Sequence, residues 1–206
     1  AASLGYALGM PAELLRQIVP IAKMDDLIRE RTGAEPGSYG SYFKINPRVD
    51  DIPDTCSVQF NGIKLLQLGS ITSGGKGCIC PESAILKSLV TYLILHNREI
   101  LIMDMEAGLE HLGRATAGAV DQFLVVVEPG KRSLETGLQI ARLAGDIGIH
   151  HLAFIANKVR NAQDLEFIRT HLNGAELAAA LPFDERAVEA DKEGASVYTA
   201  VPRLAE

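Results

Sequence analysis

The residues best suited to chemistry are Cys78 and Cys80, within the glycine-rich segment 74–81. Two thiolates are two ligands short of a closed tetrahedral metal site. Pro81 suits a first helical turn, and a helix start near Cys80 would favour its thiolate. An isologous dimer could supply the other two ligands. We therefore predict an intersubunit thiolate site for zinc, copper(I) or nickel, with a buried pair of small side chains or a redox dithiol as alternatives.

An acidic residue, Asp104, directly follows the apolar residues 100–103. A carboxylate at the end of such a strand can hold magnesium-bound water beside a nucleotide phosphate. Gly108, four residues on, could let a backbone N–H approach the terminal phosphate. The alternative for Asp104 is a helix cap or a turn.

Other polar residues follow later apolar runs: Glu128, then Asn157-Lys158, then Pro182-Phe183-Asp184. Ligands of open α/β sheets bind outside the carboxyl ends of the strands. An amide can pair with the edge of a purine and a lysine stem can cover its flat face. Pro182 would place backbone groups beside the same base. Each of these short motifs is also a common turn sequence.

The usual phosphate-binding loop, Gly-x4-Gly-Lys-[Ser/Thr], does not occur in the sequence. In the nearest segment, from Gly69 to Gly77, the spacing between the glycines differs by one residue from the motif. Lys76 is followed by a glycine instead of serine or threonine. We therefore do not interpret it as a phosphate loop.

The strands and helices that would position these residues alternate along the chain. Short apolar runs, typical of parallel strands buried on both faces, are separated by segments with helical character. This predicts an α/β fold, a doubly wound and mostly parallel sheet with helices on both faces. We expect a single domain over 1–206, with an irregular helical insertion over 1–56 and a regular core over 57–206. The predicted strands are 63–68, 100–105, 123–127, 152–156 and 177–181, and the predicted helices are 82–96, 109–119, 133–147 and 163–172.

Composition excludes several classes of function. A net charge of −6 over 206 residues argues against nucleic-acid binding. Three cysteines make a disulfide framework unexpected, so we expect a cytoplasmic protein and interpret Cys56 as structural. The longest apolar run, 89–95, is too short to cross a bilayer, and 197–206 carries no basic amphipathic helix, so no membrane partner is expected.

Five segments together resemble the CooC family, the nickel-insertion accessory ATPases of carbon monoxide dehydrogenase within the MinD/ParA and nitrogenase iron protein group of P-loop NTPases. The resemblance covers nearly the whole chain. Its most specific parts are the Cys-x-Cys loop and the Glu-His-Leu-Gly-Arg string that follows the acidic residue of the second strand. The segments are 75–81, 103–114, Val127-Glu128-Pro129, Asn157-Lys158 and Leu181-Pro182-Phe183-Asp184.

The resemblance implies a homodimeric nucleotide-binding domain that uses ATP/ADP with magnesium and delivers nickel to carbon monoxide dehydrogenase. It implies zinc or nickel at Cys78 and Cys80, magnesium at Asp104 and a γ-phosphate switch at Gly108. It places Asn157, Lys158 and Pro182 in the adenine pocket. We count Glu128, Phe183 and Asp184 among the nucleotide-binding residues as well.

Members of the family open with a strand, a Lys-Gly-Gly-x-Gly-Lys-Thr loop and an Asp-x-Asp segment, none of which is in this sequence. We therefore expect an N-terminally incomplete chain that does not hydrolyse ATP alone. Two other functions stay open: an iron–sulfur reductase or scaffold of the same fold, and a non-catalytic zinc-bridged dimerisation module.

Overall fold

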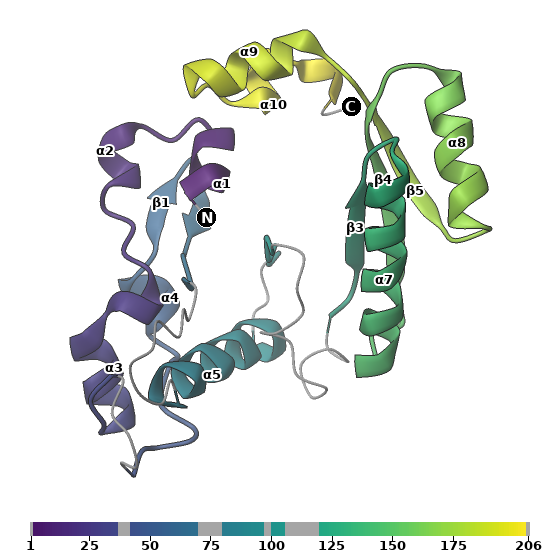
Figure 1. The fold of residues 1–206 in the computed structure, drawn as a ribbon. Coiled ribbons are helices and arrows are strands. Elements are labelled where there is room, and N and C mark those ends of the chain that lie inside the picture. Colours follow the sequence, from purple (N-terminus) through teal and green to yellow (C-terminus); the bar gives the residue numbers. More distant parts are fainter. Residues whose placement is uncertain (1, 37–41, 70–79, 97–99, 106–119, 205–206) are drawn as a thin grey trace. The chain divides into compact units, whose positions relative to one another are not determined.

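A computed structural model describes residues 2–36, 42–69, 80–96, 100–105 and 120–204 (Figure 1). The chain divides into two compact units, Ala1–Asp104 and Met105–Glu206. Three segments with predicted functions or structure lie outside the described residues: 74–79 with Cys78, 106–108 with Gly108, and 109–119.

The first unit is mainly helical and carries one short hairpin. Its longest described element, α5, begins at Cys80 with proline as its second residue, two residues before the predicted start at 82. The elements in chain order are α1 (Ala2–Ala7), α2 (Ala12–Leu15), η1 (Ile21–Lys23), α3 (Asp25–Thr32), α4 (Ile52–Thr55), β1 (Val58–Phe60), β2 (Ile63–Leu65) and α5 (Cys80–His96).

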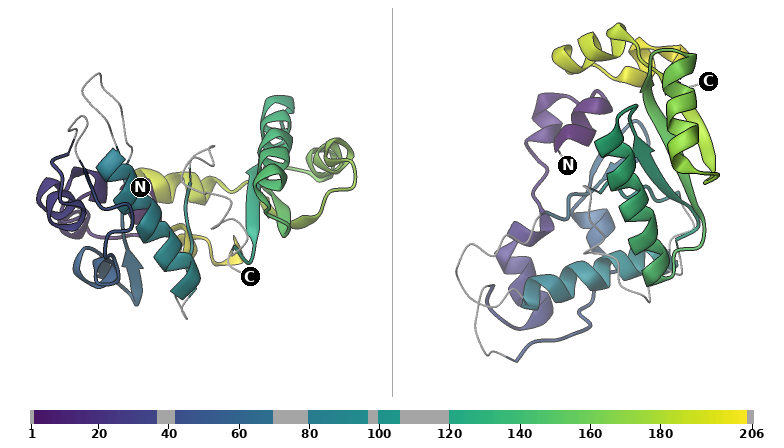
Figure 2. Two further views of the ribbon diagram at one scale, coloured as in Figure 1. Left: turned by 90° about the horizontal axis from the view of Figure 1, so that it is seen from below. Right: turned by 45° about the vertical axis from the view of Figure 1, so that its right-hand side comes forward.

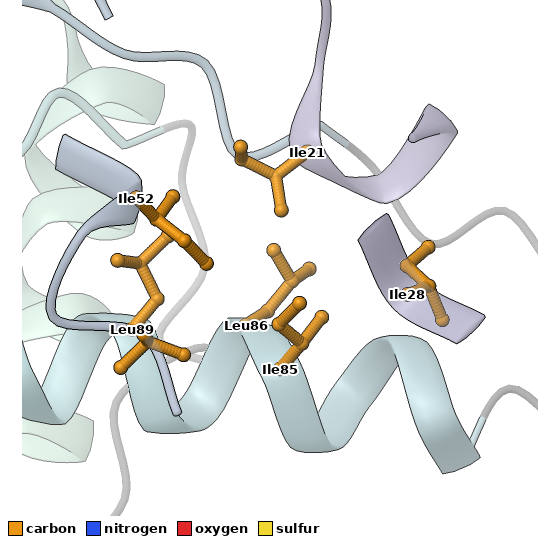
Figure 3. Close-up of a cluster of buried hydrophobic side chains, with 7 residues drawn as sticks. Ile21, Ile28, Ile52, Ile85, Leu86 and Leu89 are labelled. Carbon is orange, nitrogen blue, oxygen red and sulfur yellow. The ribbon is translucent and has the colours of Figure 1, made fainter. Parts of the chain in front are cut away.

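One face of α5 holds the first unit together. Ile85, Leu86 and Leu89 point towards side chains from η1, α3 and α4 (Figure 3). The spacing of one and then three residues places all three on one helical face. Ile21, Ile28 and Ile52 meet them, and each is fully buried.

Two predicted parallel strands differ from the structure in this unit. The run 63–68 yields only β2, which pairs antiparallel with β1 and is largely exposed. Asn61 and Gly62 both have positive φ, 47° and 79°, so they form the two-residue turn that folds these strands into a hairpin. The run 100–105 forms no strand, and Ile100 and Ile102 are exposed. The prediction of a parallel strand was therefore wrong for both runs, although the first run does contain the short antiparallel strand β2.

The second unit contains the parallel sheet. Its strands lie in the order β3-β4-β5, joined by helices, which confirms the α/β class and the parallel direction. The elements are β3 (Phe123–Val127), α7 (Lys131–Ile147), β4 (Leu152–Val159), α8 (Ala162–Leu172), β5 (Leu177–Pro182), α9 (Glu185–Glu193), α10 (Val197–Ala200) and η2 (Pro202–Leu204).

Both connecting helices pack on the same face of this sheet (Figure 2). Alternate residues of β3 and β4 meet Leu134 of α7 and Ile168 and Leu172 of α8 in one buried cluster. On the other face, Leu124 and Val126 are 48% and 57% exposed. The strand order β3-β4-β5 advances in one direction across the sheet, and two crossovers of the same hand then place both helices on one face.

Local signals account for the helix ends of this unit. Asn161 caps α8 by accepting a hydrogen bond from the Asp164 N–H, while the Asp164 carboxylate accepts one from the Arg160 N–H. α7 ends at Gly148, whose φ of 95° suits glycine. Because these signals are short-range, the sequence predicted α7 and α8 to within two residues.

Candidate functional site

The predicted base-binding residues of the second unit gather at the carboxyl ends of its three strands. Glu128 directly follows β3, Asn157 and Lys158 lie near the end of β4, and Pro182 ends β5. Because the strands are parallel, these ends lie along one edge of the sheet.

The best-defined contact at this edge joins two strands. The Lys158 ammonium nitrogen lies 2.6 Å from a carboxylate oxygen of Glu128. Both side chains are about half exposed, so the ion pair lies at the surface. The sequence pattern placed both residues at this edge but did not predict that they pair.

Asn157 has its side-chain oxygen already engaged. Its Oδ1 accepts a hydrogen bond of 2.9 Å from the backbone N–H of Lys158. An amide in this orientation presents its NH₂ group, a donor only, to any ligand. It therefore suits the acceptor positions on the edge of a purine.

The end of β4 is irregular. Ala156 pairs with Ala180 and Val159 with Pro182, so β4 has one more residue than β5 between these pairs. Lys158 sits in this bulge with a φ of 56°, a conformation uncommon for residues other than glycine. Lys158, placed in this bulge, forms its ion pair with Glu128 just beyond the end of β3.

The turn after β5 is held by the protein itself. The Phe183 N–H donates to the Val159 carbonyl at 2.9 Å, and the Arg160 guanidinium lies 5.4 Å from the centre of the Phe183 ring. That distance is within the range of a cation–π contact. Arg160 was not singled out in the sequence, because nothing local links it to a residue 23 positions away.

Asp184 is nearly buried and makes three kinds of contact. It caps α9 through the Arg186 N–H and accepts side-chain hydrogen bonds from Arg186, with an ion pair to Arg203. The Arg186 side chain, more than any other group, holds the pKa of Asp184 well below its usual value. The carboxylate is therefore ionised and satisfied within the protein.

The other predicted residues belong to the first unit or lie outside the described residues. Asp104 belongs to the first unit, where it is exposed. Cys80 is the first residue of α5, and Cys78 and Gly108 lie outside the described residues. Within the described ranges, no group of three or more His, Cys, Asp or Glu residues could hold a metal ion. Among the same residues, no helix is both long and apolar enough to span a membrane.

The parallel sheet with its connecting helices is that of an α/β protein and is consistent with a P-loop NTPase-like fold. No family model matches the chain. The carbon monoxide dehydrogenase accessory protein CooC of Rhodospirillum rubrum is 45% identical over 201 residues, 98% of this chain and 76% of that protein. This chain belongs to the CooC family.

Two uncharacterised ATP-binding proteins of Methanocaldococcus jannaschii are also similar. One is 45% identical over 192 residues, covering 92% of this chain and 73% of that protein. The other is 32% identical over 134 residues, covering 65% of this chain and 53% of that protein. The similarity to CooC thus confirms the predicted family, and the two other relatives are ATP-binding proteins.

Proposed function

We propose that this protein is an ATP-dependent accessory protein that assists nickel insertion into a carbon monoxide dehydrogenase. The observation that carries the proposal is the 45% identity to CooC over 98% of the chain. The convergence of Glu128, Asn157, Lys158 and Pro182 on one sheet edge supports the nucleotide part of the proposal. The protein would act as a cytoplasmic homodimer, and nickel would be its cargo.

The nucleotide base would lie at the carboxyl edge of β4 and β5. The Asn157 NH₂ group would donate to the purine edge, and the backbone around Pro182 and Phe183 would border the ring. Asp184 would contribute by holding this turn, because its carboxylate is engaged by Arg186 and Arg203. Asp104 would hold magnesium-bound water, and Gly108 would contact the γ-phosphate.

The metal would bind between two subunits at Cys78 and Cys80. The supporting observation is that α5 begins at Cys80, since the unpaired N–H groups of a first helical turn favour a thiolate nearby. Two thiolates from each subunit would complete a four-sulfur site for zinc or nickel. ATP binding and hydrolysis would favour different dimer geometries and so couple the nucleotide to metal release.

Metal stoichiometry tests the dimeric site. We expect one metal per two chains by elemental analysis and mass measurement of the assembly. A Cys78→Ser, Cys80→Ser double variant should lose the metal. Cys56→Ser is the matched control, because Cys56 lies at the end of α4 beside Thr55 and should not affect the metal. One metal per monomer, or metal kept by the double variant, contradicts the proposal.

The visible absorption spectrum separates the remaining alternatives. An iron–sulfur cluster at the same cysteines would give strong visible absorption with iron and sulfide in the analysis. Zinc without any binding of ATP or ADP would favour a dimerisation module. ADP binding, measured by calorimetry, together with zinc or nickel is the result that we expect.

A further inference from the structure

We infer that Glu128 is a positioning residue for the base site: it holds the Lys158 side chain across the ends of β3 and β4, so that the lysine stem forms one wall of the site. This inference rests on the proposed nucleotide function. It assigns Glu128 no direct contact with the nucleotide. The contact that carries it is the 2.6 Å ion pair between Lys158 Nζ and Glu128 Oε1.

The backbone of Glu128 is fixed on both sides. Its N–H donates to the Ser133 hydroxyl at 2.9 Å, and its carbonyl accepts from the Gly130 N–H at 2.7 Å. Gly130 caps α7, and Ser133 lies in the first turn of that helix. The Glu128 carboxylate therefore extends from a turn that the helix start holds in place.

The backbone of Lys158 is fixed as well. It lies in the bulge of β4 with a φ of 56°, and its N–H donates to Asn157 Oδ1. Residues with a Cβ rarely adopt this conformation unless the surrounding structure requires it. From this fixed backbone position the Lys158 side chain reaches Glu128, the residue that follows β3.

The two side chains balance each other in charge. A free carboxylate at a nucleotide site would repel phosphate groups, and pairing with Lys158 removes that penalty. The Lys158 side chain, with its ammonium group at Glu128, is 56% exposed, and its stem of four methylene groups leads from the end of β4 to the residue after β3. Such a stem is an apolar surface against which a flat purine ring can lie.

A double-mutant cycle on the 206-residue chain tests this role. Glu128→Gln keeps the shape but removes the charge, and Lys158→Met keeps an apolar stem but removes the ammonium. We expect Glu128→Gln to weaken ADP binding about two- to fivefold, the range expected for an exposed ion pair. In the Lys158→Met background the same change should not weaken ADP binding, because Glu128 has no ammonium group left to hold and its unpaired carboxylate is removed. The matched control is Glu135→Gln on α7, whose carboxylate lies 3.9 Å from Lys131 and should leave ADP binding unchanged.

Intermolecular nuclear Overhauser effects test the position of the Lys158 stem directly. These effects would not change if Glu128 only contributed to the stability of the fold. Wild type should show contacts between the Lys158 methylene protons and purine H8 or H2, and these should weaken in Glu128→Gln. If wild type binds ADP but Glu128→Gln is indistinguishable from it, or loses equal affinity in the Lys158→Met background, the inference is wrong and the proposed function stands. If wild type binds no ADP, both fail.

Discussion

Arg203, in the short helix η2, forms an ion pair with Asp184, which caps α9 and follows directly after Phe183. The Arg203 side chain is more than half exposed, whereas the Asp184 side chain is only 5% exposed. One contact therefore links the last described helix to the turn at the end of the parallel sheet. Arg203 therefore holds the turn that borders the proposed base site, although it lies 19 residues after Asp184 in the sequence.

The first prediction concerns this ion pair. Arg203→Met should loosen η2 and α10 while leaving the sheet intact, because Arg186 still contacts Asp184. We expect the Val201 amide, which donates to the Val197 carbonyl, to exchange with solvent about two- to fivefold faster. Hydrogen exchange followed by NMR gives the measurement.

The control for that experiment is Arg142→Met, which removes an arginine from α7 instead. Amides of β3 and β4 should exchange at wild-type rates in both variants. An unchanged exchange rate of the Val201 amide in Arg203→Met would show that the ion pair does not stabilise α10 and η2.

The second prediction is that alanine at two glycine positions of α7 changes the free energy of unfolding in opposite directions. A Cβ on Gly137 would lie 2.6 Å from Val127 Cγ1, whereas a Cβ on Gly145 would meet nothing within 4 Å. Gly137→Ala should therefore lower the free energy of unfolding by about 1–3 kcal/mol through overpacking. Gly145→Ala should raise it by about 0.5–1 kcal/mol, since alanine is the better helix former.

Thermal or urea unfolding of the two variants checks this pair. The helix and the substitution are the same in both cases, so helix propensity alone predicts equal changes. Equal stabilisation by both variants would mean that α7 does not pack closely on β3 in solution.

The second unit was largely predictable from the sequence because its signals are local. Continuous apolar runs gave the positions of β3 and β5, and caps such as Asn161 and Gly148 lie where α8 begins and α7 ends. Polar residues after each strand were correctly placed at one edge, since parallel strands share their carboxyl ends. The Glu128–Lys158 pair was not predictable, because the two residues are far apart in the sequence and no local pattern links them.

The first unit was harder to predict, because a strand exists only with a partner. Residues 100–103 have strand-like composition, yet strand formation depends on hydrogen bonds to a neighbour that the sequence does not reveal. The hairpin of β1 and β2 did have a local signal. Asn61-Gly62 between two short apolar segments is the strongest short-range hairpin motif, and it identifies the antiparallel turn directly.

The third prediction is a pH dependence in the first unit. Arg31 donates two hydrogen bonds of 2.7 Å to the Asp51 carboxylate and lowers its pKa from 3.8 to about 2. Because the folded-state pKa lies below the unfolded value, this contribution to stability is present above about pH 3.8 and is lost as pH falls through about 2.

Urea unfolding midpoints of wild type and Asp51→Asn at pH 6, 4 and 2 test this dependence. The difference between the two proteins should be constant at the two higher pH values and shrink at the lowest. A difference that does not change down to pH 2 would contradict the assigned role of the Asp51 carboxylate.

The irregular pairing of β4 and β5 also limits how chain length can vary among related proteins. β5 has an extra residue opposite the step from Phe154 to Ile155, and β4 has one between Ala156 and Val159. The two surpluses cancel, so the strands regain register at Pro182. A single insertion or deletion in either strand would turn the following side chains to the opposite face and move Arg160 away from Phe183. Length differences between relatives should therefore fall in the Asn173-Gly174 turn, or occur in compensating pairs within the two strands.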